Sequence, residues 1–292
     1  MAASEPRPGA LPNLSVQQLE YLVAVSRAPT WADAAAGVGV TPSALSQGLA
    51  ELERRVGVTL FERQGRRRVL SAPAAPVLAH AEAVVAQTRD LARWAARQRA
   101  GEGGTLRLGM IDAAAVNYFP RVLRRFREAR PDLELHLSVA PSAPLLDELG
   151  RGALDLVVCV EPPATRDGIE WTVLRSDELA IYAPSGVEVG PPSTWGPWVS
   201  FPPSSHSRLV IERSLLALGA RFEVVAESHQ PEVLREMVAL GVGWTVLPTA
   251  QAGALRPARE RPLAVRRIVA ARRIGAAPNA GAEALTAALR RT

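Results

Sequence analysis

Two short helices separated by a glycine-containing turn are predicted in residues 31–53. This helix pair limits the kinds of fold and function that the chain can have more than any other stretch. Thr30 can cap the first helix, which ends at a Gly-Val-Gly segment because glycine disfavours helix. Thr41 can cap the second helix, and Pro42 then takes the first helical position, where a missing N–H does no harm. Two helices about a tight turn form a structure that fits the major groove of DNA.

The second helix has an apolar stripe and a polar face. The stripe follows helical spacing at Leu45, Leu49, Leu52 and Val56. Polar side chains lie off that stripe, near the start of the helix, where they can reach base edges and phosphates. The predicted DNA-contacting residues of this helix are Thr41, Pro42, Ser43, Ser46 and Gln47.

An arginine-rich hairpin is predicted directly after these helices, over residues 59–70, with a turn at Gln64-Gly65. Its cationic residues are Arg63, Arg66, Arg67 and Arg68. In isolation such a cluster is equally consistent with a solvated surface, but after two DNA-reading helices phosphate contacts are favoured. The net charge of +5 is weaker support, because all 34 basic residues are arginine, which by itself raises the isoelectric point.

Residues 40–71 resemble the helix-turn-helix and wing of LysR-type transcriptional regulators. The similarity rests on Val-Thr-Pro-Ser-Ala-Leu-Ser-Gln at 40–47, Leu-Glu at 52–53 and Gly-Val-Thr-Leu-Phe-Glu-Arg at 57–63. It continues through the basic wing, which ends in Leu-Ser where the family has Leu-Thr. The alternative is an αα-hairpin in an unrelated helical domain, which the agreement of order, spacing and wing disfavours. The resemblance implies a winged helix-turn-helix domain over residues 14–72.

Composition bounds the class of protein. With 292 residues, 48% apolar and 22% charged, the chain has the composition of a globular protein of two or three domains. Residues 1–13 lack an apolar signal core and are expected to be a disordered lead-in. The single cysteine excludes an internal disulfide framework and suits a reducing cytoplasm. No apolar run reaches membrane-spanning length, so we expect a cytoplasmic protein with no membrane partner.

A long helix is predicted over residues 73–99, followed by a flexible joint that extends to residue 103. Small and apolar side chains recur at spacings of four and three, at Val77, Ala81, Val84, Thr88, Leu91, Ala95 and Gln98. This is a weak heptad seam. The alternative is a single amphipathic helix packed along the body of the protein. The resembled family uses this segment as a linker helix that pairs antiparallel, so the resemblance implies a homodimer or homotetramer.

From residue 104 onward, alternating strands and helices predict a parallel sheet, with one helix over residues 116–130. Residues 105–109, 123–131 and 152–156 also match the regulatory domain of the family. That domain resembles the two-lobed periplasmic solute-binding fold, whose lobes are joined by two crossing strands. The resemblance implies lobe I at residues 104–175 and 267–292, lobe II at 176–266, and crossings near 175–177 and 265–267.

Strand ends and helix starts of both lobes are expected to meet in a crevice, where free backbone N–H groups can hold a ligand. The predicted effector-binding residues are Asp112, Ala113, Ala114, Ser142, Ser204, Ser205, His206 and Gln230. A solvated turn is the alternative for the Ser-Ser-His segment. The family often has Ser or Thr after the first regulatory strand, where a carboxylate is held. The acid at Asp112 departs from that pattern and leaves anionic, neutral and cationic effectors open.

An enzyme or simple small-molecule-binding α/β protein with an incidental helix-turn-helix is the alternative from another class. Cys159 lies in an apolar run, where a buried structural thiol is expected. The 4 histidines show no metal-ligand spacing, so no metal site is expected. The sequence has no Gly-x-Ser-x-Gly nucleophile and no Walker-type phosphate loop, and its Gly-Val-Gly segments lack the third glycine of a dinucleotide site. We therefore expect no enzymatic activity and no cofactor.

These observations predict an α+β multi-domain protein with three parts: a winged helix-turn-helix, a long linker helix and a two-lobed α/β effector-binding domain. The predicted function is sequence-specific transcriptional regulation, modulated by a small-molecule effector bound between the lobes. The expected partners are double-stranded DNA with an interrupted palindromic operator, the effector, and further copies of the chain. RNA polymerase is an additional candidate partner.

Overall fold

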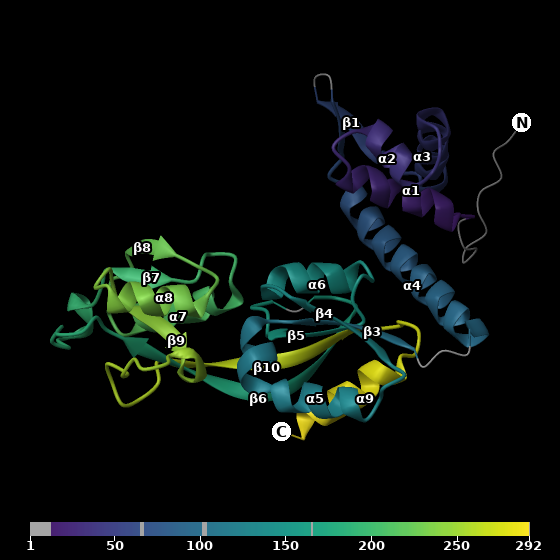
Figure 1. Ribbon diagram of the computed structural model, residues 1–292. Helices are drawn as coiled ribbons and strands as arrows, with labels where there is room; N and C mark the ends of the chain where they lie inside the picture. The colour runs from purple at the N-terminus through teal and green to yellow at the C-terminus, as the bar shows by residue number, and fades with distance from the viewer. Residues whose placement is uncertain (1–12, 65–66, 101–103, 165, 292) are drawn as a thin grey trace, which may run out of the picture. The chain divides into compact units, whose positions relative to one another are not determined.

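The computed structural model describes residues 13–64, 67–100, 104–164 and 166–291. It divides into two compact units, residues 1–93 and 94–292. The N-terminal unit holds a helical bundle with a two-stranded hairpin (Figure 1). Its elements are α1 (Val16–Arg27), α2 (Trp31–Gly37), α3 (Pro42–Val56), β1 (Phe61–Gln64), β2 (Arg67–Leu70) and α4 (Ala74–Ala100), whose last residues belong to the second unit.

Hydroxyl caps begin the first three helices. Ser15, Thr30 and Thr41 each accept a hydrogen bond from the backbone N–H three residues further on. These bonds satisfy N–H groups that have no partner inside the helix. α3 ends at Gly57, whose φ of 72° lies in the left-handed region that glycine adopts without strain. The predicted caps at Thr30 and Thr41 are confirmed.

The core of the N-terminal unit forms where α1 and α3 approach closely. A side chain at Gly48 would place its Cβ only 2.7 Å from the ring of Tyr21, so glycine permits this approach. The predicted stripe of α3 faces the same core, where Leu45, Leu49 and Leu52 are buried. The two-helix reading of this stretch is therefore confirmed, with the polar face of α3 turned outward.

The first half of the predicted heptad seam on α4 packs inside the N-terminal unit. Ala81 is fully buried, and Val77 and Val84 are partly buried, in the core that the helix-turn-helix forms. Leu91, further along the helix, is 59% exposed. The first half of the seam therefore already has intramolecular partners, and the pairing of α4 with a second copy stays a prediction.

The second unit is a mixed α/β structure. Its strands are β3 (Thr105–Met110), β4 (Glu134–Val139), β5 (Leu156–Val160), β6 (Ile169–Tyr182), β7 (Trp198–Ser200), β8 (Val224–Glu227), β9 (Thr245–Pro248) and β10 (Ala264–Arg273). Its α-helices are α5 (Pro120–Glu128), α6 (Ser142–Gly150), α7 (His206–Ala217), α8 (Pro231–Ala239) and α9 (Ala280–Arg290). Short helical segments are η1 (Ala113–Tyr118), η2 (Pro192–Thr194) and η3 (Thr249–Gln251).

The main sheet has six strands in the order β4-β3-β5-β10-β6-β9. β3 pairs in parallel with β4 and β5. β10 runs antiparallel to both β5 and β6, and β9 runs antiparallel to β6. The prediction of a parallel sheet is therefore wrong beyond β5, because β10 returns from the far lobe in the opposite direction to the strands beside it.

The predicted helix over residues 116–130 is two elements. η1 is a π-helix that ends at Tyr118, and α5 begins at Pro120 after Phe119. A proline at the start of α5 has no N–H to continue the preceding helix, which accounts for the break.

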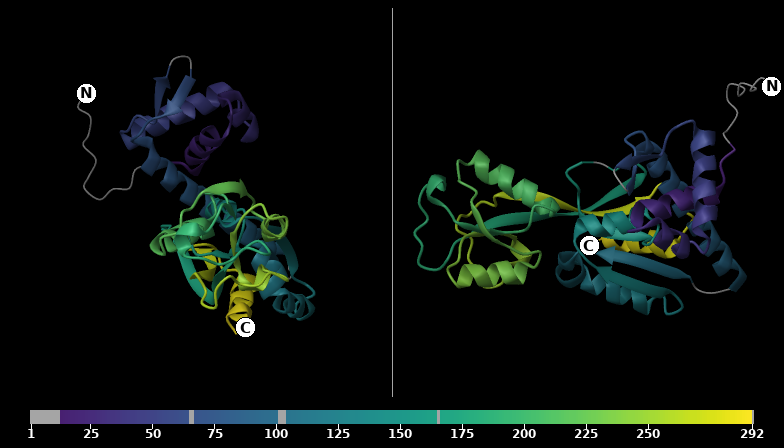
Figure 2. Two further views of the ribbon diagram at one scale, coloured as in Figure 1. Left: turned by 90° about the vertical axis from the view of Figure 1, so that its left-hand side faces the viewer. Right: turned by 90° about the horizontal axis from the view of Figure 1, so that it is seen from above.

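Two separate hydrophobic cores lie along the sheet. One is built around β3 and β5, with α6 above the strands and α5 and α9 below them in Figure 1. The other contains the end of β6, the middle of β9 and the inner faces of α7 and α8. Between the cores, Arg266 of β10 pairs in register with Asp177 of β6. These two strands run from one lobe to the other, as the right panel of Figure 2 shows.

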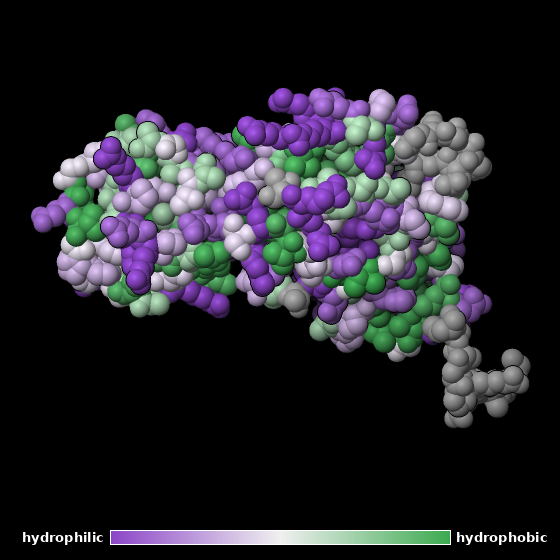
Figure 3. Space-filling model, turned by 90° about the horizontal axis from the view of Figure 1, so that it is seen from below, coloured by the Kyte–Doolittle hydropathy of each residue, from purple (hydrophilic) through white to green (hydrophobic). Residues whose placement is uncertain are grey.

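Tryptophans fill the core of the second lobe. Trp195 stacks on Trp244 with ring centroids 5.7 Å apart, and Trp198 lies 6.1 Å from Trp244. The Nε1–H of Trp198 donates to the carbonyl of Arg221 over 2.7 Å. The irregular stretch around η2 therefore contributes to this core. On the outside, hydrophilic and hydrophobic side chains are interspersed in the view of Figure 3.

Candidate functional site

The N-terminal part of α3 presents polar side chains on its outer face. Ser43 and Gln47 are exposed and Ser46 is half-buried, whereas the opposite face is in the core. The hydroxyl of Thr41 accepts from the N–H of Ala44 over 3.2 Å. The first turn carries no acidic side chain, so the positive end of the helix dipole is not neutralised there. A helix start of this kind favours phosphate groups.

The arginine-rich hairpin forms the predicted wing. β1 and β2 pair with Arg63 opposite Arg68 and Gln64 opposite Arg67. Arg63 and Arg68 are exposed. Arg66, the Gly65 turn and the side chain of Arg67 lie outside the described residues.

Aromatic contacts fix the wing against α2. The guanidinium of Arg68 lies 5.1 Å from the ring centroid of Trp31, and Trp31 meets Phe61 edge-on at 5.0 Å. The carboxylate of Glu53 accepts from the N–H groups of Leu60 and Phe61, at 2.7 and 3.2 Å. Trp31 is half-buried against the core of the N-terminal unit and additionally contacts Arg68, which sequence spacing alone did not indicate.

A cavity of about 340 Å³ lies between the two lobes of the second unit. Its apolar lining consists of Ile111, Ala113, Val139, Ala140, Pro141, Val160, Phe201 and Pro231. Its polar lining consists of Asp112, Ser142, His229, Gln230, Glu232, Gln251 and Arg266. The volume falls in the lower part of the range for small-molecule sites, roughly 300–1,000 Å³. Strand ends and helix starts from both lobes meet here, as open α/β sheets arrange them.

Four of the predicted effector residues line this cavity: Asp112, Ala113, Ser142 and Gln230. Ala114 does not, because its side chain is fully buried in the core of lobe I. The hydroxyl of Ser142 accepts from the N–H of Val160 over 3.2 Å, so it joins α6 to β5. Ser142 is therefore a structural contact as well as part of the cavity wall.

The predicted Ser-Ser-His loop lies outside the cavity lining. Ser205 is the residue before α7 and His206 is the first residue of that helix, so the segment is a helix start. The Nδ1 of His206 lies 3.0 Å from the carbonyl oxygen of Val160, a contact between the lobes. Burial lowers the pKa of His206 from its ordinary value of 6.5. Ser204 is an exposed turn residue.

Sequence reasoning missed Gln251, Glu232 and Arg266, three polar residues of the cavity wall. The Nε2–H of Gln251, in η3 of lobe II, donates to Oδ2 of Asp112 over 3.2 Å. Glu232 lies in the first turn of α8. Burial raises the pKa of Asp112, and the negative charge of Glu232 raises it further. Asp112 directly precedes η1, but its carboxylate makes no capping hydrogen bond to that helix.

A buried polar network lies where the strands cross between the lobes. Arg266 donates from Nε to Oδ2 of Asp177 over 2.7 Å and from Nη1 to the hydroxyl of Ser207 over 2.8 Å. The hydroxyl of Tyr118 donates to the same Asp177 oxygen over 2.6 Å. The Nη2 of Arg266 is buried and has no hydrogen-bond partner among the described residues. Arg175 covers the ring of Tyr118 at 4.3 Å.

Two models of known protein families match the chain, one in each of its two units. The profile described as a bacterial regulatory helix-turn-helix protein of the lysR family matches residues 16–75. The profile described as a LysR substrate binding domain matches residues 99–292, more than half of the chain. This chain belongs to the LysR family of transcriptional regulators. A LysR-type regulator binds DNA through its helix-turn-helix and a small-molecule effector through its regulatory domain, and it assembles into multimers.

The similarity to individual relatives covers nearly the whole length of this regulator. It is 31% identical over 299 residues to a probable hydrogen peroxide-inducible genes activator of Streptomyces viridosporus, covering 94% of this chain and 93% of that protein. Full-length OxyR from Pseudomonas aeruginosa has a similar fold, with a TM-score of 0.65, 21% identity and 95% of each chain covered. Full-length CbnR in complex with its target DNA has a TM-score of 0.60 and 18% identity, covering 95% of this chain and 99% of CbnR.

Metal binding and thiol chemistry find little support in the part of this LysR-type regulator that the structure describes. No group of three or more His, Cys, Asp and Glu side chains there could hold a metal ion. Cys159 is completely buried in β5, and burial raises the pKa of its thiol to about 12. None of the described helices has the length and apolarity of a membrane span.

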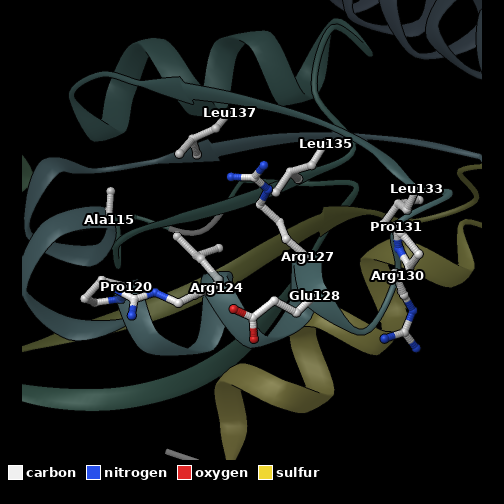
Figure 4. Close-up of a pocket in the computed structure, with 11 residues that line it drawn as sticks. Ala115, Pro120, Arg124, Arg127, Glu128, Arg130, Pro131, Leu133, Leu135 and Leu137 are labelled. Atoms are coloured by element: carbon white, nitrogen blue, oxygen red, sulfur yellow. The ribbon is translucent and has the colours of Figure 1, made fainter.

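A second hollow of the regulator lies on the outer surface of lobe I. Its volume is about 940 Å³, and it is bounded by α5 and the edge strand β4. Leu133, Leu135 and Leu137 of this region contribute apolar surface, and Arg127 extends from α5 toward Leu135 (Figure 4). None of the predicted effector residues lines this groove.

Proposed function

We propose that the chain reads an interrupted palindromic operator with the polar face of α3. Ser43, Ser46 and Gln47 would contact base edges, and the helix start at Thr41 and Pro42 would lie against phosphates. The observation that carries this assignment is the division of α3 into a buried leucine face and an outward polar face at its capped N-terminus. A dimer would present two such helices, which matches the symmetry of a palindrome.

The wing supplies the sequence-independent part of the affinity. Arg63 and Arg68, together with Arg66 and Arg67, would contact phosphates or the minor groove beside α3. The contact between Arg68 and Trp31 supports a wing held in one orientation, so less freedom is lost when DNA binds.

The cavity between the lobes would hold the effector. Asp112, Ala113, Ser142 and Gln230 remain its proposed ligands, joined by Gln251 and Glu232, while Ala114, Ser204, Ser205 and His206 are no longer proposed as direct contacts. An effector that binds the closed arrangement better would shift the population toward it. A few kcal/mol of differential affinity is enough for such coupling.

Binding, and not thiol oxidation, is the proposed mode of sensing. Some relatives are named for induction by hydrogen peroxide. A thiol that senses peroxide must be accessible and ionised, because the thiolate is the nucleophile. The only cysteine of this chain is buried and strongly protonated, which disfavours that chemistry here. We further propose that the chain is a cytoplasmic regulator without enzymatic activity.

Selection of DNA from a randomised pool by the full-length protein tests this proposal. The expected product is a two-fold symmetric motif with two half-sites separated by a spacer. A pool that shows no enriched motif after repeated rounds, while binding remains salt-sensitive, would contradict sequence-specific reading and leave only phosphate affinity.

A further inference from the structure

The inference concerns a role for Trp31 in DNA binding, and it rests on the proposed function of the wing. Trp31 is the first residue of α2, and its ring is half-buried against the core of the N-terminal unit. The guanidinium of Arg68 lies over this ring, 5.1 Å from its centroid. Among the described residues no carboxylate lies within ion-pair distance of Arg68, so the aromatic ring is the contact that fixes its side chain.

The wing differs in this respect from the rest of its unit. The other described arginines of the N-terminal unit form ion pairs with carboxylates, namely Arg27, Arg54, Arg55, Arg89 and Arg93. On the wing, Arg63 lies directly opposite Arg68 in the strand pair, so both side chains leave the same face of the hairpin. Like charges directly opposite each other are destabilising. The hairpin therefore holds two neighbouring cations that an anion would stabilise.

A series of contacts connects Arg68 to the reading helix α3. The ring of Trp31 meets that of Phe61 edge-on, with centroids 5.0 Å apart and an interplanar angle of 64°. The N–H of Phe61 donates to Oε1 of Glu53 over 3.2 Å, and the N–H of Leu60 donates to the same oxygen over 2.7 Å. Because Glu53 belongs to α3, the aromatic pair is fixed relative to the helix that is proposed to read the bases.

A guanidinium that stacks on an aromatic ring keeps its N–H donors in its own plane, where they are free to bind an acceptor. Phosphate oxygens match this arrangement of donors. An arginine without such support loses more conformational freedom when it binds, which reduces affinity. We propose that Trp31 is a positioning residue for DNA binding, which holds the guanidinium of Arg68 beside Arg63 so that this pair meets backbone phosphates in one orientation. Trp31 acts through Arg68 and does not itself contact DNA.

A double-substitution cycle on the full-length protein tests this role. The probe is a random-sequence duplex, because phosphate contacts carry no sequence information. Arg68→Ala is expected to weaken binding and to lower the slope of log affinity against log salt concentration by about one unit. Trp31→Leu keeps an apolar side chain against the core and removes the aromatic face. It is expected to weaken binding about two- to fivefold, the usual value of an exposed cation–π contact.

The decisive comparison is the effect of Trp31→Leu in two backgrounds. In the Arg68→Ala protein it is expected to cause no further loss of affinity, because the side chain that Trp31 positions is absent. Arg89→Ala provides the matched control background, since Arg89 is exposed on α4 and bonded to Glu20. There Trp31→Leu is expected to keep its full effect. Trp31→Phe retains an aromatic face and is expected to bind with an affinity between those of Trp31→Leu and the unaltered protein.

Two results would overturn the proposal. One is an equal loss from Trp31→Leu with and without Arg68, which a purely structural role of the ring would give. The other is an affinity of Trp31→Leu that equals that of the unaltered protein. If Trp31→Leu does not fold, the same cycle is measured with Trp31→Phe, and equal losses in both backgrounds again count against the proposal.

The ratio of affinities for the selected operator and for random DNA separates this inference from the proposed function. A protein that prefers its operator, but in which the effects of Trp31 and Arg68 are additive, remains a sequence-specific regulator. Only the positioning role of Trp31 is then removed. A protein without any preference for an operator contradicts the proposed function itself, whatever the outcome of the cycle.

Discussion

The Nε–H of Arg266 donates to Oδ2 of Asp177 over 2.7 Å, and these side chains are only 5% and 2% exposed. The two residues lie on β10 and β6, where the strands cross between the lobes. Tyr118 from lobe I and Ser207 from lobe II complete the network. The ion pair therefore ties the two crossing strands to each other and to both lobes.

Breaking this pair should destabilise the regulatory unit strongly. Asp177→Asn leaves the buried charge of Arg266 uncompensated, a change that costs about 3–5 kcal/mol in buried pairs. Glu161→Gln is the control, because it removes the partner of Arg267 on the same strand from a largely exposed pair. Exposed pairs contribute about 0–1 kcal/mol. Urea unfolding followed by tryptophan fluorescence compares the variants, and equal midpoints for both would contradict a structural role for the buried pair.

The contact between His206 and Val160 predicts a pH dependence. Burial, and to a smaller degree Arg166, lowers the pKa of His206, whereas the Val160 carbonyl and Asp147 act in the opposite direction. The folded state therefore binds the proton less well than the unfolded state, so stability is full above about pH 6.5 and falls as the pH drops below that value. His206→Gln should flatten this dependence between pH 7 and roughly pH 5. An unchanged slope in the variant would show that another group is responsible.

The exposed half of α4 should carry dimer contacts. Leu91 is 59% and Trp94 is 37% exposed, so both offer apolar surface to a second copy. Leu91→Asp would bury an unpaired charge in such a contact and should raise the dimer dissociation constant by about tenfold or more. Ala92→Asp, at the neighbouring exposed position, should have little effect. Sedimentation of the full chain checks this, and identical association of both variants and the unaltered protein would exclude the Leu91 face.

Local features were predictable from the sequence. The caps at Thr30 and Thr41 were correct because a capping hydrogen bond spans only three residues. The apolar stripe of α3 was correct because helical spacing determines which side chains share a face. Family resemblance placed the winged helix-turn-helix and the two-lobed domain, which composition alone does not distinguish from other α/β arrangements.

Long-range pairing was not predictable in the same way. Arg266 and Asp177 are 89 residues apart, and Gln251 and Asp112 are 139 apart, so no local pattern brings them together. The reversed direction of β10 has the same origin, since it depends on a chain that crosses to lobe II and returns. His206 was assigned to a loop because its serine-rich surroundings suggest a turn, whereas those serines precede a helix start.

The wing should act through phosphates. Arg63→Ala should weaken binding to specific and random DNA alike and reduce the slope of log affinity against log salt concentration by about one unit. Arg89→Ala serves as the control, because Arg89 of α4 is bonded to Glu20. Binding isotherms over a series of salt concentrations give the slopes. A slope that is the same for Arg63→Ala and the unaltered protein would mean that this arginine is only solvated surface.

Base reading by α3 is tested most directly with Gln47→Ala. Gln47 is exposed near the capped start of α3, where a bidentate contact to adenine is within reach of a glutamine in the major groove. The measurement is the ratio of affinities for the selected site and for random DNA, with Gln17→Ala of α1 as the control. The substitution should cost about 1–3 kcal/mol on the selected site and little on random DNA, so the ratio falls. Equal losses on both DNAs, or an unchanged ratio, would contradict sequence reading by this helix.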